Sequence, residues 1–313
     1  MTSSSNFSKY LAAENERLCQ NLTSPKHPVC FVIGLPRVAS TLLVQCLVSV
    51  FEIGYVSNIT ARFPDAPYIG ARLSRELAEH GYVSNFRSSF GNTSGAEEPH
   101  EWGWFWQSVL GLNKDSHYSD SGEEIDIDRV GCMIAALEDI YQAPCIFDNV
   151  FAMANIVSLK KKLKSIVVID LTRDPFYVCS SILNARRERF GNYSEFYGHR
   201  PKNINEILKC INPVEQVVLQ VRSIVQEIEE AKSFFATEEV ISIDYDELVL
   251  NPAVAIEAIE SFFSNLGVPL VRKSNSANFT FENRNDPKFV KEDIRSELDL
   301  YYARHFSDMP RSR

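Results

Sequence analysis

The sequence predicts an α/β protein with three layers, in which a mainly parallel sheet is flanked by helices. Two observations predict this class. Short, continuously apolar runs suit strands that are covered on both faces, as they are in a parallel sheet. Segments with helical periodicity separate these runs, which favours right-handed crossovers. The 313 residues are 45% hydrophobic and 23% charged, as is typical of a globular protein with a large core.

Four apolar runs are the predicted strands. Residues 29–33 and 165–171 give the strongest signals, and shorter runs cover residues 145–147 and 240–243. The run at 29–33 ends at Gly34 and leads directly into an apolar helix. Helices are predicted at residues 41–51, 129–141, 152–164, 174–189, 213–235, 245–250 and 252–266.

The other segments lack this alternation. Residues 1–27 are polar and predict an N-terminal arm or short helix. Residues 55–122 combine Pro, Gly, Ser and aromatic residues without clear periodicity, so we expect an excursion from the sheet on the acceptor side. The tail after Lys273 is polar and shows no clear pattern. Because there is no repeat or linker, a single domain is predicted over residues 28–313.

Charge and cysteine usage exclude several classes of function. The chain carries 32 basic and 41 acidic residues, for a net charge of −9, which disfavours binding to nucleic acid or anionic lipid. None of the seven cysteines forms a CxxC pair, and this favours a reducing compartment. There is no secretory signal and no apolar stretch of the ~20 residues that span a bilayer. We therefore expect a soluble, cytoplasmic protein.

A phosphate-loop-like segment, GLPRVAST, begins at Gly34 between a predicted strand and a predicted helix. Such a position exposes the first N–H groups of the helix, which bind anions. The pattern GxxxxGK[ST] is kept at Gly34 and Thr41, but Ala39 takes the second glycine position and Ser40 the lysine position. The loop therefore lacks the lysine that an NTPase uses, and its only cation is Arg37.

A second segment, TRDP, follows the strand at 165–171 and contains Arg173. Ligands of open α/β sheets gather at the carboxyl ends of the strands, which is where Arg173 is expected. Ser181 comes eight residues later, about two helical turns away, and is close enough to bind the same phosphate. Asp170 at the end of this strand is an alternative candidate, as a carboxylate that holds magnesium.

Three segments carry a resemblance to a known family. GLPRVASTLL resembles the 5′-phosphosulfate loop of sulfotransferases that use 3′-phosphoadenosine 5′-phosphosulfate (PAPS), and VVIDLTRDPFYVCSSIL resembles their 3′-phosphate segment. Tyr245 in ISIDYDELVLNP is similar to the family tyrosine that reaches the nucleoside side of the cofactor. The order of the segments is that of the family, and each follows a predicted strand. The chain thus resembles bacterial-type sulfotransferases with a P-loop-NTPase-like fold.

This resemblance implies a donor site for PAPS and no metal. Two departures from the family pattern stand out. Val38 and Ala39 replace the usual serine and glycine, and an alanine at positive φ costs about 1 kcal/mol or more. The Gly-rich basic segment near the C-terminus of cytosolic sulfotransferases of animals is absent, so its share of the 3′-phosphate contacts either comes from elsewhere, with Arg186 or Arg187 as candidates, or is missing. The residues implied to bind the donor are Pro36, Arg37, Val38, Ala39, Ser40, Thr41, Arg173, Ser181 and Tyr245.

The segment EEPHEWGWFW supplies the candidate for general base. His100 can accept a proton near neutral pH, and Glu101 either orients it or acts itself. Arg37 is assigned to the charge that develops on the leaving phosphate. Glu52 and Asp65 are alternative bases. Trp102, Trp104, Phe105 and Arg62 are assigned to acceptor binding, although the aromatic residues and a helix start at His100 would equally suit a buried core.

These observations predict transfer of a sulfuryl group from PAPS to a hydroxyl or amine of a small-molecule or glycan acceptor. The products would be a sulfate ester and 3′,5′-bisphosphoadenosine. Two other functions stay open. A P-loop kinase or NTPase is compatible with Asp170 but disfavoured by Ser40, and a non-catalytic nucleotide-binding relative is compatible with the changes at Val38 and Ala39.

Overall fold

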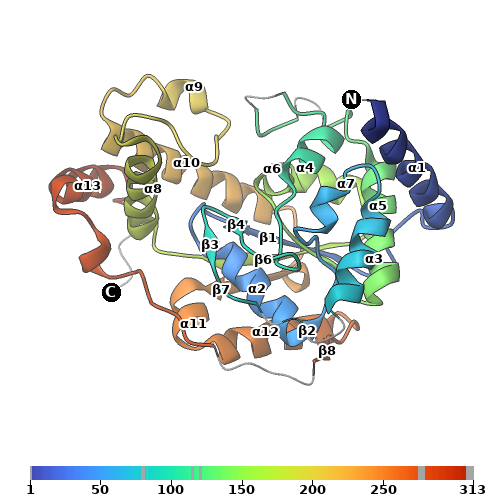
Figure 1. The fold of residues 1–313 in the computed structure, drawn as a ribbon. Coiled ribbons are helices and arrows are strands. Elements are labelled where there is room, and N and C mark those ends of the chain that lie inside the picture. The colour runs from blue at the N-terminus through green and yellow to red at the C-terminus, as the bar shows by residue number, and fades with distance from the viewer. Residues whose placement is uncertain are drawn as a thin grey trace.

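A four-stranded parallel sheet forms the centre of the molecule (Figure 1). The computed structural model describes residues 2–78, 82, 84–113, 116–119, 122–273 and 279–307. The strand order is β5-β1-β6-β7, and every pairing in this sheet is parallel, so the predicted fold class is confirmed. The strands are β1 (Val29–Gly34), β5 (Ile146–Asp148), β6 (Ile166–Thr172) and β7 (Val240–Asp244).

The register of these strands brings the loop of the first motif next to the second. Along β1 and β6, Val29 pairs with Ile166 and Gly34 pairs with Leu171. A Cβ added at Gly34 would lie 2.5 Å from the carbonyl oxygen of Leu171, so only glycine permits this approach. The residues that follow β1 and β6 therefore leave the sheet side by side at its carboxyl edge.

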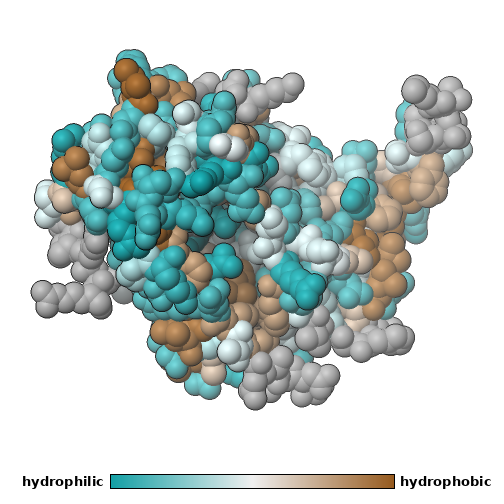
Figure 2. Space-filling model, turned by 60° about the vertical axis from the view of Figure 1, so that its left-hand side comes forward, coloured by the Kyte–Doolittle hydropathy of each residue, from teal (hydrophilic) through white to brown (hydrophobic). Residues whose placement is uncertain are grey.

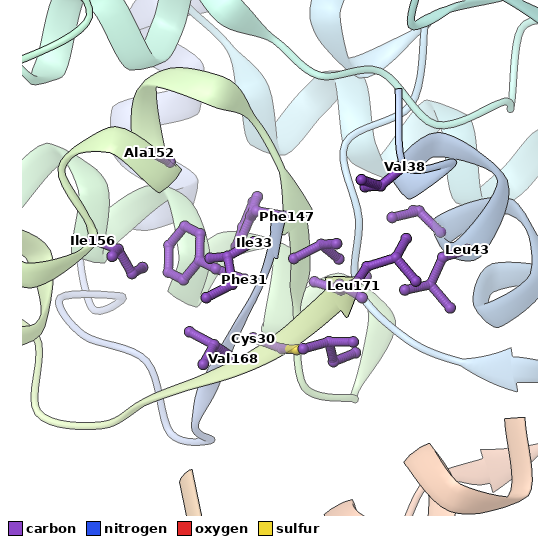
Figure 3. Close-up of a cluster of buried hydrophobic side chains, with 14 of the residues drawn as sticks. Cys30, Phe31, Ile33, Val38, Leu43, Phe147, Ala152, Ile156, Val168 and Leu171 are labelled. Carbon is purple, nitrogen blue, oxygen red and sulfur yellow. The ribbon is translucent and has the colours of Figure 1, made fainter. Parts of the chain in front are cut away.

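Helices cover both faces of the sheet. In Figure 1, α2 (Ser40–Val50), α11 (Tyr245–Leu250) and α12 (Pro252–Asn265) lie below the sheet, whereas α6 (Val150–Ala154) and α10 (Pro213–Lys232) lie above it. The strand sequences are continuously apolar because the side chains on both faces of the sheet are buried. Figure 3 shows Phe31 and Ile33 pointing towards Ala152 and Ile156 on one face, and Leu171 lying towards Leu43 of α2 on the other.

The remaining elements surround this core. Helix α1 (Thr2–Cys19) packs against α3 (Pro67–Leu77), and α3 packs against α5 (Ile127–Tyr141). The Glu138 side chain of α5 accepts the backbone N–H groups of Lys26 and His27, at 2.6 and 3.1 Å. The other elements are β2 (Phe51–Glu52), η1 (Thr60–Arg62), β3 (Ser88–Ser89), β4 (Asn92–Thr93), α4 (Gly103–Val109), α7 (Ile156–Lys162), α8 (Pro175–Phe190), α9 (Ile204–Ile207), η3 (Thr237–Glu239), β8 (Val271–Arg272), η4 (Pro287–Phe289) and α13 (Glu292–His305).

Several helical assignments differ from the sequence prediction, among them α3 and α9, which were not predicted, and α4, which was predicted only as an alternative. The helix expected at 152–164 is interrupted at Asn155, whose side chain accepts the Ser119 N–H at 2.9 Å and donates to the His117 carbonyl at 2.8 Å. Asparagine commonly breaks a helix by such side-chain bonds to backbone groups. The polar tail contains helix α13, which packs against α8 and α10 through residues spaced four apart: Ile294, Leu298 and Tyr302.

The side of the molecule in Figure 2, on which α8, α9 and α13 come forward, is mainly hydrophilic, with apolar residues in smaller groups. None of the helices in the described part of the chain has the length and apolarity needed to cross a lipid bilayer.

Asp170 does not lie where a magnesium ligand is required. Its carboxylate points to the face covered by α10, where it forms a 2.6 Å ion pair with Lys232 and accepts a 3.1 Å hydrogen bond from Ser242. Only 2% of Asp170 is exposed, so its negative charge is balanced inside the protein by lysine. This ion pair disfavours the alternative in which Asp170 holds magnesium.

This pair gives a test of the fold. We expect Lys232→Met to lower the free energy of unfolding by about 1–3 kcal/mol, because it leaves the Asp170 carboxylate buried without a counter-charge. The double variant Asp170→Asn with Lys232→Met should recover most of the loss in urea denaturation. Equal destabilisation of the single and double variants would contradict this account.

Candidate active site

The loop between β1 and α2 holds two residues in the left-handed region. Arg37 has φ 70° and Ala39 has φ 72°, and neither is glycine. Ala39 is the N-cap of α2, and no side chain caps the helix there. The first N–H groups of α2 are consequently left for an anion, which is the arrangement that the loop pattern predicts.

A cavity of about 580 Å³ opens at the carboxyl edge of the sheet, beside this loop. Residues from all three motif segments line it, although they are far apart in the sequence. The lining includes every residue assigned to the donor: Pro36, Arg37, Val38, Ala39, Ser40, Thr41, Arg173, Ser181 and Tyr245. Glu101, Asp148 and Arg284 line the same cavity.

Arg173 is a buried cation whose hydrogen bonds go to neutral oxygens. Its guanidinium donates to the carbonyl of Arg37 at 2.5 Å, to Asn285 Oδ1 at 2.8 Å and to the carbonyl of Arg284 at 3.2 Å. The ring of Tyr245 lies 4.2 Å from the guanidinium carbon. Burial lowers the pKa of Arg173, but a guanidinium keeps its charge in proteins. Within the described part of the chain its hydrogen bonds all go to neutral oxygens, and a positive charge without a carboxylate in direct contact is suited to binding an anion.

Arg37 connects the loop to α8. Its Nε donates to Ser181 Oγ at 3.3 Å, and its guanidinium lies 5.4 Å from the centre of the Phe90 ring. Arg37, Arg173 and Arg284 thus supply three cations to one cavity in a chain of net charge −9. Three carboxyl groups, Glu101, Asp148 and Glu282, line the same cavity, so the cavity offers an anionic ligand three cations without a net positive charge of its own.

Arg284 was missed by the sequence analysis, and the two arginines suggested in its place lie elsewhere. The Arg284 N–H donates to the Tyr245 hydroxyl at 3.1 Å, which fixes the tail beside α11. Arg186 is fully buried and donates to Gln216 at 2.7 Å, while Arg187 pairs with Asp293 at 2.7 Å. Neither Arg186 nor Arg187 lines the cavity. The only sequence signal for Arg284 was a basic residue in an otherwise unassigned polar tail.

Two carboxyl groups, Glu101 and Asp148, lie beside the loop. Burial and the neighbouring Asp148 raise the pKa of Glu101, and Arg37 opposes this shift. Burial also raises the pKa of Asp148, although hydrogen bonds from Ser40 and Thr41 act against it. Gly91, at φ 82°, packs against Glu101 so closely that a Cβ would overlap Oε1. A carboxyl group with a raised pKa in a cavity is a candidate proton acceptor.

His100 has no free lone pair with which to accept a proton. Its Nδ1 accepts the backbone N–H of Trp102 at 2.8 Å, so the neutral ring carries its proton on Nε2. Burial and the nearby Arg62 lower the pKa of His100, which keeps the ring neutral. The side chain lines a separate small cavity of about 20 Å³, which Glu101 also reaches. This geometry favours Glu101 over His100 as the base.

Trp102, the N-cap of α4, and Phe105 within this helix belong to the core rather than to a binding wall. Trp102 is 0% and Phe105 is 1% exposed, and their rings stack 4.3 Å apart. Trp104 is 39% exposed, and neither it nor Arg62 lines the cavity. The assignment of these four residues to the acceptor is therefore not supported. The aromatic lining comes instead from Phe86, Phe90, Phe151, Tyr197, Tyr245 and Phe281.

The alternative bases also lie outside the cavity. Glu52 forms an ion pair with Arg75 at 2.5 Å, and Asp65 is exposed to solvent. Within the described ranges, no group of three His, Cys, Asp or Glu residues is close enough to hold a metal ion.

Comparisons with known proteins agree with this geometry. A family model described as Sulfotransferase family matches residues 28–269. The solved structure of sulfotransferase STF1 from Mycobacterium tuberculosis H37Rv is similar with a TM-score of 0.53 at 11% identity, over 96% of this chain and 82% of that one. Sulfotransferase STF9 from Mycobacterium avium gives 0.50 at 13% identity, over 97% and 81%. No curated protein matches in sequence. The likeness to solved structures confirms the predicted fold.

The strained loop gives a second test. Ala39→Gly should raise the free energy of unfolding by about 0.5–1 kcal/mol, because glycine adopts positive φ without a Cβ clash. Ala135→Gly in helix α5 is the matched control, and we expect it to lower stability by about 1 kcal/mol. Thermal or urea denaturation measures both, and a loss of stability in Ala39→Gly would contradict the strain at this position.

Proposed function

The chain belongs to the sulfotransferase family, and we propose that it transfers a sulfuryl group from PAPS to a hydroxyl group of a small acceptor. The products are a sulfate ester and 3′,5′-bisphosphoadenosine. The single observation that carries the donor assignment is Arg173, a buried cation in the cavity whose hydrogen bonds, among the described residues, all go to neutral oxygens. PAPS carries the phosphates that such a cation would bind.

We assign the donor contacts by charge and position. The loop residues 36–41 and the N-terminus of α2 would hold the 5′-phosphosulfate, as they do for anions at this position in other α/β folds. Arg173, Ser181 and Arg284 would hold the 3′-phosphate, and Tyr245 would lie on the nucleoside side. The donor supplies an activated sulfur atom with a phosphate as its leaving group.

Glu101 is proposed as the general base. The acceptor oxygen forms a bond to sulfur, the bond between sulfur and the 5′-phosphate oxygen breaks, and the electron pair leaves with the bisphosphate. The proton of the acceptor hydroxyl passes to the Glu101 carboxylate, whose raised pKa makes it a stronger base than an exposed glutamate. Arg37 would stabilise the negative charge that develops on the leaving phosphate.

The other functions are less well supported. A kinase or NTPase would require a cation at position 40, where this chain has Ser40, and Asp170 is neutralised by Lys232. A non-catalytic relative would bind the bisphosphate without turnover.

All seven cysteines are free thiols, which supports the proposed cytoplasmic location.

The donor assignment predicts that 3′,5′-bisphosphoadenosine stabilises the protein in a thermal-shift assay and that AMP does so much less. Arg173→Ala should weaken binding of the bisphosphate by about 1.5–3 kcal/mol, because it removes a charge-assisted contact. Arg284→Ala should weaken it as well, whereas the exposed Arg187→Ala is the matched control. Wild-type affinity in Arg173→Ala would overturn the assignment, and stabilisation by Mg-ATP alone would favour a kinase.

The base assignment predicts that Glu101→Gln lowers turnover by about 10²–10⁴ while the affinity for the bisphosphate is kept. The base acts only when ionised, so the wild-type rate should rise with pH through a pKa above the usual range of glutamate. That rising limb should vanish in Glu101→Gln and persist in His100→Ala. The reverse result in the two pH profiles would identify His100 as the base.

A further inference from the structure

A second cavity of about 510 Å³ adjoins the donor cavity, between α7 and α10. The two cavities share Ile33, Met153 and His199 as lining residues. The first two are apolar, so His199 is the polar group at the boundary. His117 lies against it, with the ring centres 5.0 Å apart, and also lines the donor cavity.

The surroundings of His199 fix which nitrogen carries its proton. Nε2 lies 2.8 Å from the Tyr118 hydroxyl, and this hydroxyl donates its own proton to the Glu227 carboxylate. Nε2 also lies 3.9 Å from the Glu227 carboxylate. In the neutral ring Nε2 is then the donor to Tyr118, and the lone pair is left on Nδ1. Nδ1 is buried and has no hydrogen-bond partner among the described residues, while the side chain as a whole is only 2% exposed. An unpaired acceptor at such a site is costly unless a ligand or water satisfies it.

The surroundings of His117 give the same tautomer but leave its other nitrogen, Nε2, without a partner in the described part of the chain. Its Nδ1 accepts the backbone N–H of Arg200 at 3.3 Å, so its proton is on Nε2. No hydrogen bond to this Nε2 occurs within the described ranges. Burial, with His199 and Arg200 nearby, lowers the pKa of His117 to about 3, so the ring is neutral at physiological pH. His117 therefore offers a hydrogen-bond donor at Nε2, and His199 offers an acceptor at Nδ1.

The backbone holds this pair next to the donor loop. Gln220 Nε2 donates to the His199 carbonyl at 2.8 Å and to the Tyr197 carbonyl at 3.0 Å. Gly198, between them, has φ 94°, and a Cβ built there would lie 4.0 Å from Cβ of Pro36 in the loop. On its other side, the His117 ring packs against Phe151 with the ring centres 4.8 Å apart.

We propose that His117 and His199 bind a hydroxyl group of the acceptor other than the one that is sulfated. That hydroxyl accepts from His117 Nε2 and donates to His199 Nδ1. A carboxylate offers only acceptors and an ammonium only donors, whereas a hydroxyl satisfies both rings without adding charge. The inference rests on the proposed function and narrows the acceptor to a polyhydroxylated small molecule, with Phe90 and Phe151 lining the same cavity.

Binding of matched probes to the protein loaded with 3′,5′-bisphosphoadenosine tests this subsite without any turnover. The probes are phenol with catechol, and cyclohexanol with vicinal cyclohexanediol. NMR of ¹⁵N-labelled histidine should show both rings as Nε2–H tautomers in the free protein. The dihydroxy member of at least one pair should bind about tenfold more tightly than its monohydroxy partner. Its binding should also change the ¹⁵N chemical shifts of the ring nitrogens of His117 and His199.

His117→Phe keeps a ring against Phe151 but removes the donor, so the preference for the dihydroxy probe should vanish. His27→Phe is the matched control and should keep it, because His27 lines neither cavity. Equal affinities within both pairs, or a proton on His199 Nδ1, would overturn the subsite and leave an ordered water as the partner of the two rings. Failure of sulfuryl transfer would appear separately, as loss of product from PAPS while the probe titration is unchanged.

Discussion

Arg173 holds together the parts of the molecule on which the site depends. Its guanidinium contacts the loop at Arg37, the tail at Arg284 and Asn285, and the ring of Tyr245 on α11. The loop and α11 lie beside Arg173 because β1 and β7 both pair with β6 up to its carboxyl end, at Gly34–Leu171 and at Asp244–Thr172, and the tail then crosses this edge. The Asp246 carboxylate offsets part of the cost of burying this cation, but the hydrogen bonds of Arg173 go to neutral oxygens, and an anionic ligand would compensate for the rest. Stability and ligand binding therefore oppose each other at this residue.

Stability and ligand binding also oppose each other in the loop between β1 and α2. Arg37 and Ala39 both adopt positive φ, which costs about 1 kcal/mol or more for a residue with a Cβ. The hydrogen bond from Arg173 to the Arg37 carbonyl and the close packing of Gly34 on Leu171 hold the chain in this shape. Strain of this kind is typical of functional loops, because it orients N–H groups before a ligand arrives.

The sequence predicted the elements whose signal is local. Continuous apolar runs identify strands that are covered on both faces, and a loop between such a strand and a helix identifies an anion site. Properties set by distant contacts could not be predicted in this way. A run of aromatic residues does not reveal that Trp102 and Phe105 face inwards, and the tautomer of His100 depends on one backbone N–H. Arg284 reaches the cavity only through tertiary contacts of a tail without periodicity.

The position of Arg284 and Asn285 in the chain has a consequence for biosynthesis. The loop at residues 34–41 is made early, but two of the groups around Arg173 come from residues 284 and 285. A nascent chain on the ribosome consequently has a sheet edge and a loop long before it has a complete cavity. Any ligand that depends on the complete cavity can stabilise only chains that extend past residue 285, so such a ligand favours these chains over ones cut before it.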